Sequence, residues 1–330
     1  MTSPVPLRRV GASGLLVSAV GLGCNNFGRE GTRSETIDGT RAVLDAAIDA
    51  GVTFLDTADM YGKDAGLSET LMGQALQGRR DQVTLATKFG HFGRDIGYPP
   101  SGAKASRSYV RRAVEGSLSR LQTEWIDLYQ LHTPDPQTPI EETLDVLGDL
   151  VREGKVRYIG HSNLAGWQIA EAHYVAAERA GIPFVSAQNH YSLLARAAER
   201  EVLPAVRRFG LGFFPYFPLQ NGLLTGKFSR DHAPKDSRIM RQRQHVWQEA
   251  PWDALERFQE FCDERGITML EATFGWLLAR PALSSVIAGA TSPEQVHANA
   301  AAASAWAPTS ADLAEIDALF PLPEDPGAKV

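Results

Sequence analysis

Short apolar runs alternate with longer stretches of helical spacing along almost the whole chain. The runs have the length of buried strands and occupy residues 19–23, 53–56, 83–87, 126–131, 156–160, 184–188, 211–215 and 285–288. Apolar residues recur at helical intervals over residues 36–50, 66–77, 106–121, 139–152, 164–180 and 197–208. A long irregular segment covers 218–250, and further helices are predicted near 252–265 and 268–280, from Pro293 onwards and near 310–319. Residues 7–17 predict a small hairpin that turns at Gly11–Gly14.

This alternation of strands and helices indicates the α/β class with a parallel sheet. Eight such units in 330 residues favour a closed (β/α)8 TIM barrel over an open doubly wound sheet. The hairpin precedes the barrel, and extra helices are expected after strands seven and eight. The chain has no internal repeat, low-complexity linker or change of composition at its middle, so we expect one domain over residues 1–330.

Composition and charge narrow the class of protein. Charged residues make up 22% of the chain and the net charge is -6, so no broad positive field is available to attract nucleic acid or an anionic membrane. Two cysteines, Cys24 and Cys262, are too few for a disulfide scaffold and favour a reducing compartment. Residues 1–19 lack the pattern of a signal peptide, and no run approaches the ~18 apolar residues of a membrane span. We therefore expect a cytoplasmic protein with no membrane or nucleic-acid partner.

Three consecutive predicted strands end in chemically useful residues. Asp56 ends the second strand and Tyr61 lies in the following loop, whereas Lys88 and His132 end the third and fourth strands. Because side chains alternate along a strand, Lys88 and His132 can both face the barrel centre. The carboxyl ends of barrel strands meet on one face, so we expect these four side chains to lie together.

The four residue types form a coherent chemical set. A tyrosine has an unperturbed pKa near 10, and a neighbouring ammonium favours its phenolate and lowers that pKa. A carboxylate would hold the ammonium, and a histidine could donate a hydrogen bond to a carbonyl oxygen. Singly, each residue has an ordinary explanation as a helix cap, a packing tyrosine, a solvated lysine or a core histidine. Their combination on consecutive strand ends favours a site with a general acid facing a carbonyl.

At these motifs the sequence resembles the aldo-keto reductase superfamily, in its bacterial branch with short terminal segments. The motifs are residues 54–62 (FLDTADMYG), 86–90 (ATKFG) and 127–132 (DLYQLH), which match the family's catalytic tetrad in order. The resemblance implies that Tyr61 is the general acid, Lys88 lowers its pKa, Asp56 pairs with Lys88, and His132 orients the carbonyl. Asp59 is then expected to be structural.

The resemblance also implies where a nicotinamide cofactor would bind. Ser162 and Asn163 match the pair that holds the carboxamide, and Gln188 matches their usual partner, since an amide supplies both a donor and an acceptor. A cap for a helix starting near Leu164 is the ordinary explanation for Ser162 or Asn163. Tyr216 is expected to stack on the nicotinamide. The other cofactor-binding residues implied are Phe217, Pro218, Leu219, Gln220, Gly222, Leu224, Lys227, Gly289, Thr291, Gln295 and Asn299.

Two of these positions depart from the family's usual pattern. Phe217 stands where a serine is common, which removes one polar contact but leaves a backbone contact. Many relatives carry an arginine for a 2′-phosphate near Thr291. Ser292, Pro293 and Gln295 fit a capping box at a helix N-terminus, which is a ready anion site. NADPH is expected as the family's usual cofactor, and NADH stays open.

The substrate side is less specified. The expected pocket residues are Asn25, Phe27, Tyr61, Phe89, His91 and Trp247. Residues 227–243 concentrate cations in an acidic protein, which favours either an anion contact, such as a lid over a pyrophosphate, or a solvated loop. These cations are Lys227, Arg230, Lys235, Arg238, Arg241 and Arg243, against Asp231 and Asp236.

The function implied is reduction of aldehydes or ketones by an NAD(P)H-dependent oxidoreductase with a small-molecule carbonyl substrate, as a monomer or weak homo-oligomer. One alternative is a nucleotide-holding, redox-sensing or regulatory subunit with little turnover. Another is a Schiff-base enzyme built on Lys88, which the expected ion pair with Asp56 opposes. The chain contains no His-x-His on the first strand and no His-Glu-x-x-His, so no metal site is expected.

Overall fold

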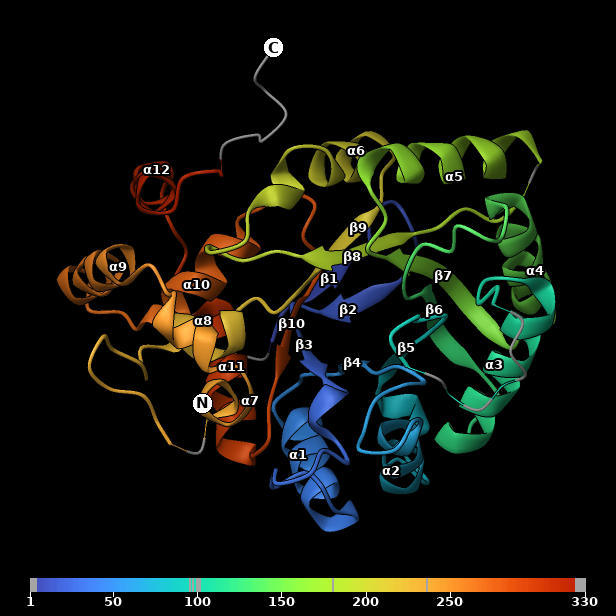
Figure 1. Ribbon diagram of the computed structural model, residues 1–330, viewed down its shortest axis with the longest axis horizontal. Coiled ribbons are helices and arrows are strands. Elements are labelled where there is room, and N and C mark those ends of the chain that lie inside the picture. Colours follow the sequence, from blue (N-terminus) through green and yellow to red (C-terminus); the bar gives the residue numbers. More distant parts are fainter. Residues whose placement is uncertain are drawn as a thin grey trace.

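Eight parallel strands form the centre of the molecule. The computed structural model describes residues 5–323 apart from residues 95, 97, 99–101, 180 and 236. The strands pair in the order β10-β3-β4-β5-β6-β7-β8-β9, so that β3 to β9 follow their order in the chain and β10 lies beside β3 (Figure 1). They are β3 (Val20–Gly23), β4 (Phe54–Asp56), β5 (Thr84–Phe89), β6 (Ile126–Leu131), β7 (Val156–Ser162), β8 (Ser186–His190), β9 (Gly212–Tyr216) and β10 (Val286–Gly289).

The sheet curls until its two edges almost meet. Phe213 on β9 forms an isolated parallel bridge with Leu283, just before β10. The Phe213 N–H donates to Ala282 O at 2.9 Å, and the Ser284 N–H donates to Phe213 O at 2.9 Å. The structure therefore confirms the predicted (β/α)8 barrel.

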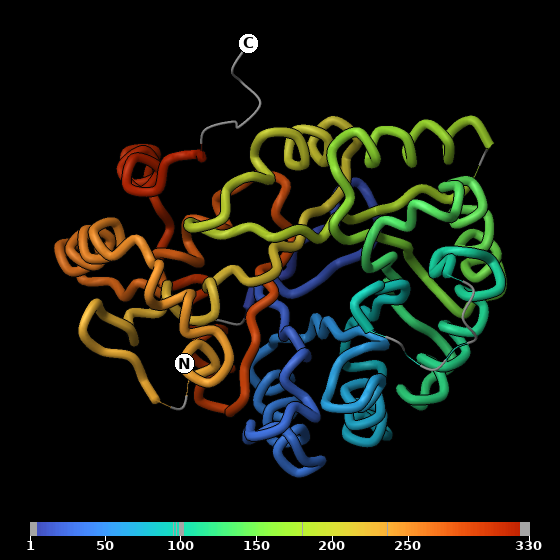
Figure 2. The backbone as a smooth tube through the Cα atoms, viewed as in Figure 1, coloured from blue at the N-terminus to red at the C-terminus, as the bar shows by residue number. Residues whose placement is uncertain are grey.

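Helices surround the strands, as the chain trace in Figure 2 shows. In α4, buried residues 143, 144, 147 and 150 follow the spacing of one helix face, so the helix packs that face on the sheet. The helices between barrel strands are α1 (Ile37–Asp49), α2 (Leu67–Ala75), α3 (Arg107–Leu121), α4 (Ile140–Arg152), α5 (Gly166–Glu178), α6 (Val202–Arg208) and α10 (Met269–Leu278). The extra helices after the seventh and eighth barrel strands are α7 (Arg238–Gln242), α8 (Gln244–Gln248), α9 (Trp252–Glu264), α11 (Pro293–Ala305) and α12 (Ser310–Leu319).

The N-terminal hairpin covers the end of the barrel where the strands begin. Strands β1 (Leu7–Arg9) and β2 (Leu16–Ser18) pair antiparallel, as predicted. Hairpin side chains join inward-facing strand residues in one buried cluster, which contains Val10, Leu15, Val17, Phe54, Ala86, Leu128, Phe214 and Ile287. At the turn, Gly11 has φ +54°, and a Cβ there would lie 2.2 Å from Gly210 O. Glycine is therefore required for this close approach.

Strand register sets which side chains meet inside the barrel. Lys88, Gln130, Gly160 and Ser186 lie at one level on four adjacent strands. A Cβ on Gly160 would lie 2.3 Å from Ser186 Oγ and 3.3 Å from Gln130 Cγ. The glycine leaves room for the longer side chains of its neighbours, and the predicted inward orientation of Lys88 is confirmed.

Several predicted boundaries differ from the structure. α5 begins at Gly166 rather than near residue 164, and Asn163 has a left-handed φ of 64°, so neither Ser162 nor Asn163 caps this helix. The stretch 197–208 divides into a 3-10 turn and α6, which places Pro204 in the first turn of α6, where its missing N–H costs nothing. The segment 218–250 contains a 3-10 turn, η4 (Gln220–Thr225), and the short helices α7 and α8.

The capping box expected at α11 is wrong. Ser292 is the N-cap residue, but its side chain makes no capping hydrogen bond. Gln295 Oε1 instead accepts from the Thr291 N–H at 2.8 Å and from Thr291 Oγ1 at 3.2 Å. In a capping box Gln295 would accept from the N–H of the N-cap residue Ser292, but it accepts from the preceding residue, Thr291.

Within the part of the chain that the structure describes, no helix combines the length and the apolar character needed to span a bilayer.

One buried histidine links the fold to pH. His161 on β7 pairs with Leu131 and Ala187 on the strands beside it, and it is 0% exposed. Both of its ring nitrogens lack a hydrogen-bond partner among the described residues. Burial lowers the pKa of His161 from 6.5 to about 3. The folded chain therefore resists a proton that the unfolded chain accepts at mildly acidic pH.

We predict that His161→Leu reduces the loss of stability in acid. Between pH 6.5 and 3 the unfolded wild type binds the extra proton, so its stability falls as the pH drops. At pH 4.5 this single group costs about 2.5 kcal/mol of unfolding free energy relative to pH 7.5. Urea denaturation at both pH values would measure the difference, with His297→Leu at an exposed site as the control. An equal loss in wild type and His161→Leu would contradict the prediction.

Candidate active site

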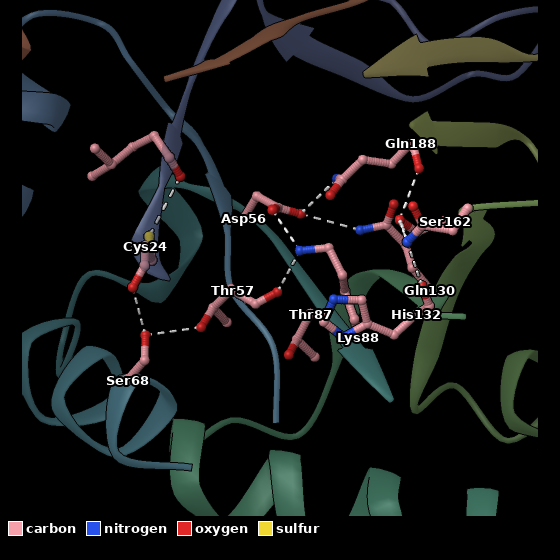
Figure 3. Close-up of polar contacts among 12 residues, drawn as sticks. Cys24, Asp56, Thr57, Ser68, Thr87, Lys88, Gln130, His132, Ser162 and Gln188 are labelled. Carbon is pink, nitrogen blue, oxygen red and sulfur yellow. Dashed lines mark hydrogen bonds and ion pairs between the residues drawn. The ribbon is translucent and has the colours of Figure 1, made fainter. Parts of the chain in front are cut away.

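A fully buried ion pair joins β4 and β5 at the carboxyl end of the barrel. Lys88 Nζ donates to Asp56 Oδ2 at 2.5 Å and to Thr57 O at 2.8 Å (Figure 3). The Lys88 side chain is 0% exposed and that of Asp56 is 4% exposed. Such a pair is stable only if its remaining hydrogen-bonding capacity is satisfied.

Two side-chain amides complete the shell around Asp56. Gln130 Nε2 from β6 and Gln188 Nε2 from β8 donate to Asp56 Oδ1 at 3.2 and 3.1 Å. Figure 3 shows both amides directed at the Asp56 carboxylate. From the sequence alone, Gln188 is assigned only to the cofactor site and Gln130 has no assigned role. Their position inside the barrel, on the same strand faces as the ion pair, is the signal that could have found them.

The Asp56 charge keeps Lys88 protonated. Burial alone lowers the pKa of Lys88, but Asp56 and then Tyr61 outweigh it, and the pKa rises above its usual value. A Schiff-base lysine must lose its proton before it attacks a carbonyl. The geometry therefore argues against an enzyme that uses Lys88 as a nucleophile.

Tyr61 lies beside this pair. Lys88 Nζ is 5.2 Å from the centroid of the Tyr61 ring. Burial raises the pKa of Tyr61, while Lys88 and Asn25 act in the opposite direction. Lys88 therefore acts in the expected direction, but removal of the phenol from water outweighs the lysine charge and the pKa of Tyr61 is raised overall. The phenol stays protonated at neutral pH, which suits a proton donor.

Asp59, the second aspartate of the motif, takes no part in the ion pair. Both carboxyl oxygens are buried and lack a partner among the described residues. Burial, followed by the charge of Glu69, raises the pKa of Asp59 well above its usual value. This shift favours the neutral, protonated carboxyl, unlike the ionised carboxylate of Asp56 that pairs with Lys88.

His132 faces Tyr61 from the end of β6. The two ring centroids are 5.9 Å apart and the rings are nearly perpendicular. Burial, then Lys88, then His91 lower the pKa of His132 well below its usual value. A neutral imidazole keeps one N–H, so His132 can donate a hydrogen bond to a carbonyl oxygen without adding a charge.

An arginine missed at the sequence level fixes the Tyr61 loop. Arg94 donates from Nη1 to Met60 O at 3.0 Å and to Gly62 O at 2.7 Å, and from Nη2 to Lys63 O. These carbonyls lie on both sides of Tyr61. Lys104 Nζ in turn donates to Arg94 O at 3.0 Å, so the clamp is itself anchored. The sequence contains no local pattern that predicts this role of Arg94, because the side chain contacts backbone atoms of another loop.

The residues expected at the carboxamide lie together next to His132. Ser162 Oγ donates to Gln188 O at 2.7 Å. Asn163 Nδ2 donates to His132 O at 2.9 Å and to Ser162 Oγ at 3.1 Å. Tyr216 Oη donates to Asn163 Oδ1 at 2.9 Å. The Tyr216 ring is parallel to His190 with 5.3 Å between centroids, which gives a flat aromatic surface beside the amide groups.

The chain after β9 turns tightly, in the segment where the sequence predicts contacts with the cofactor. Phe217, Gln220 and Asn221 have φ of 51°, 45° and 59°, and Gly222 has φ of 108°. Gln220 Oε1 lies 3.0 Å from His190 Nε2. Pro218 and Leu224 are buried and Lys227 is exposed. On β10 and the N-terminal part of α11, Gly289 is exposed, Thr291 and Gln295 are partly exposed, and Asn299 is buried.

The residues expected to line the substrate pocket differ in their distance from the tetrad and in their exposure. Asn25 is partly exposed and acts on the Tyr61 phenol, and the His91 ring lies 4.7 Å from that of His132. Phe27 and Phe89 are 0% exposed, which argues against their lining an open pocket. Trp247 is partly exposed, and its Nε1 donates to Ser229 O at 2.9 Å.

Comparisons with known proteins agree with this geometry. The model of the Aldo/keto reductase family matches residues 19–320. The chain belongs to the aldo/keto reductase family. This family member is 40% identical over 294 residues to the uncharacterized oxidoreductase YrpG of Bacillus subtilis (strain 168), with 87% of this chain and 88% of that protein covered. It is 36% identical over 300 residues to the uncharacterized oxidoreductase YqkF of the same strain, with 90% and 91% covered.

A third relative has a named reaction. L-glyceraldehyde 3-phosphate reductase of Escherichia coli (strain K12) is 32% identical over 323 residues, with 94% of this chain and 91% of that protein covered. Together with the family match, these relatives indicate that this aldo/keto reductase family member is an oxidoreductase acting on carbonyl groups. Enzymes of this family generally use a reduced nicotinamide cofactor.

We predict that Asp56→Asn destabilises this aldo/keto reductase family member by about 3 kcal/mol, because Lys88 keeps a buried charge with no counter-ion. Urea denaturation at pH 7 would measure the loss. The double variant Asp56→Asn with Lys88→Met removes both charges and should recover most of the stability. A double variant as unstable as the single one would show that the ion pair is not the cause.

Proposed function

We propose that this protein is an NADPH-dependent carbonyl reductase with Tyr61 as general acid. The observation that carries the proposal is the convergence of a protonated phenol, a buried ammonium and a neutral imidazole at the carboxyl end of the barrel strands. His132 would donate a hydrogen bond to the substrate carbonyl oxygen and hold it within reach of Tyr61. The substrate would be an aldehyde or a ketone.

A bound reduced nicotinamide would supply the hydride that adds to the carbonyl carbon. Tyr61 would give its proton to the oxygen, so the C=O bond becomes an alcohol. The charge of Lys88 would stabilise the phenolate that Tyr61 leaves behind, and Asp56 would keep that lysine charged and in place. Solvent then returns a proton to Tyr61.

The residues around the site fit a nicotinamide cofactor. Asn163 Oδ1 accepts from Tyr216 and keeps a second lone pair, and Gln188 Nε2 donates one N–H to Asp56 and keeps a second, so both amides can still bond a carboxamide. Tyr216 offers a flat face for a ring. The tight turn at Gln220–Thr225 lies next to these residues, because Gln220 Oε1 is 3.0 Å from His190 Nε2 beside Tyr216. NADPH is proposed over NADH because it is the usual cofactor of the family that the sequence resembles, and the assay below compares the two.

We predict that Tyr61→Phe lowers kcat by about 100-fold or more, because the variant keeps the ring but has no proton to donate. Oxidation of NADPH, and separately of NADH, would be followed at neutral pH with a panel of aldehydes and ketones. Full activity in Tyr61→Phe would refute its role as general acid. Wild type that binds the cofactor but reduces no carbonyl would refute the proposed reaction.

Arg94 should act as a positioning residue for Tyr61. We predict that Arg94→Met lowers kcat roughly tenfold or more, since small errors in the position of a reacting group are costly. The affinity for cofactor should stay at the wild-type value, and Arg94→Lys should restore part of kcat. Steady-state kinetics and the melting temperature would be measured, with Arg41→Met on the surface of α1 as the control. A wild-type kcat in a folded Arg94→Met variant would contradict this role.

A further inference from the structure

Four arginines gather above the active site from two loops. Arg29 lies in the loop after β3, whereas Arg238, Arg241 and Arg243 lie on or beside α7. We call these four residues the arginine cluster. Among the residues that the structure describes, none of the four forms an ion pair with a carboxylate, although the protein carries a net charge of -6. Asp236, which is close in sequence, lies outside the described residues.

The cluster is electrostatically unfavourable as it stands. Burial first, then Arg29 and Arg243, lower the pKa of Arg238 from 12.5 to about 10. Burial and then Arg243 also lower the pKa of Arg29. Like charges brought together in a partly buried place disfavour their own protonated forms. An anion between them would relieve this repulsion.

One side-chain donor is left without a partner. Arg238 Nε is buried and makes no hydrogen bond within the described part of the chain. The guanidinium groups of Arg238 and Arg243 lie 5.4 and 5.3 Å from the centroid of the Phe217 ring, which holds both in place. A buried donor without a partner is costly, so a ligand with several acceptor oxygens fits this position. Arg241 instead contacts the protein itself: its Nη1 donates to Gly31 O at 2.6 Å, which joins α7 to the loop after β3.

The arginine cluster is connected to the catalytic tyrosine. Arg29 Nη2 donates to Asn25 Oδ1, and Asn25 in turn acts on the Tyr61 phenol. Tyr61 also lies close enough to Arg29 and Arg238 for its phenol oxygen to interact electrostatically with both guanidiniums. An anion held by these guanidiniums would therefore lie near the reacting carbonyl, at a distance that a short carbon chain can span.

We propose that Arg29, Arg238 and Arg243 bind an anionic group of the carbonyl substrate, and that this group is a phosphate monoester. Three guanidiniums carry more positive charge than one carboxylate neutralises, and their paired N–H donors match phosphate oxygens. The inference rests on the proposed carbonyl reductase function. It names the substrate class as small phosphorylated aldehydes or ketones. A phosphate of the cofactor has the same chemistry, so the test separates the two sources.

The test compares glyceraldehyde with glyceraldehyde 3-phosphate at equal concentrations of NADPH. Wild type should show a kcat/KM at least tenfold higher for the phosphorylated aldehyde, because the phosphate accepts charge-assisted hydrogen bonds that the neutral aldehyde cannot accept. Arg29→Gln and Arg243→Gln should each lower the ratio of the two kcat/KM values about tenfold. Arg33→Gln removes one charge from the same exposed loop, where its partner is Glu294, and should leave the ratio unchanged.

Two further measurements identify the source of the anion. Inorganic phosphate should inhibit competitively against glyceraldehyde 3-phosphate and not against NADPH. The dissociation constant of NADPH, measured by fluorescence titration, should differ less than twofold between wild type and Arg29→Gln. A wild-type ratio near one, or variants that weaken NADPH binding while the ratio stays constant, would overturn the proposal and assign the cluster to the cofactor. With either of these results the enzyme would still reduce neutral aldehydes, so the proposed function would stand. Inactivity with every carbonyl would instead refute the proposed function.

Discussion

The buried ammonium of Lys88, which requires a counter-ion and hydrogen-bond acceptors, organises the centre of this protein. Lys88 has no exposed surface, so its ammonium depends on Asp56 and on the carbonyl of Thr57. The carboxylate in turn depends on amides from β6 and β8. Four barrel strands are thus tied to one cation, and a shift of any one of them would leave a polar group unsatisfied in the interior.

The same interaction connects the two halves of the proposed reaction. Gln188 donates to Asp56 through its side chain, and its backbone carbonyl accepts from Ser162, which belongs to the expected carboxamide site. The groups that would hold the cofactor are therefore built on the groups that keep Lys88 charged. Stability and catalysis draw on one hydrogen-bond network, and for that reason the Asp56 and Tyr61 variants test different properties of the same centre.

Local sequence patterns predicted the strands, the hairpin and the face of the barrel that carries the tetrad, because strand periodicity and strand-end polarity are local signals. Helix starts were predicted less well. Asn163 does not cap α5 but adopts a left-handed conformation, and its side chain accepts a hydrogen bond from Tyr216, a contact that no local pattern encodes. The lowering effect of Lys88 on the pKa of Tyr61 could be read from the motif, but the opposing and larger effect of burial could not. Arg94 and Gln130 act across loops or strands, so only the folded chain reveals them.

The closure of the barrel has a consequence for how the chain is made. Val20, near the start, pairs with Val286, near the end, so β3 has a bare edge until almost the entire protein has left the ribosome. An unpaired edge is a template for association with other chains. Contacts between such distant segments also form slowly, because the long loop between them must close first. The barrel therefore loses its unpaired, aggregation-prone edges only when the last two strands have been synthesised. Truncation before β10 would leave the edges of β3 and β9 unpaired.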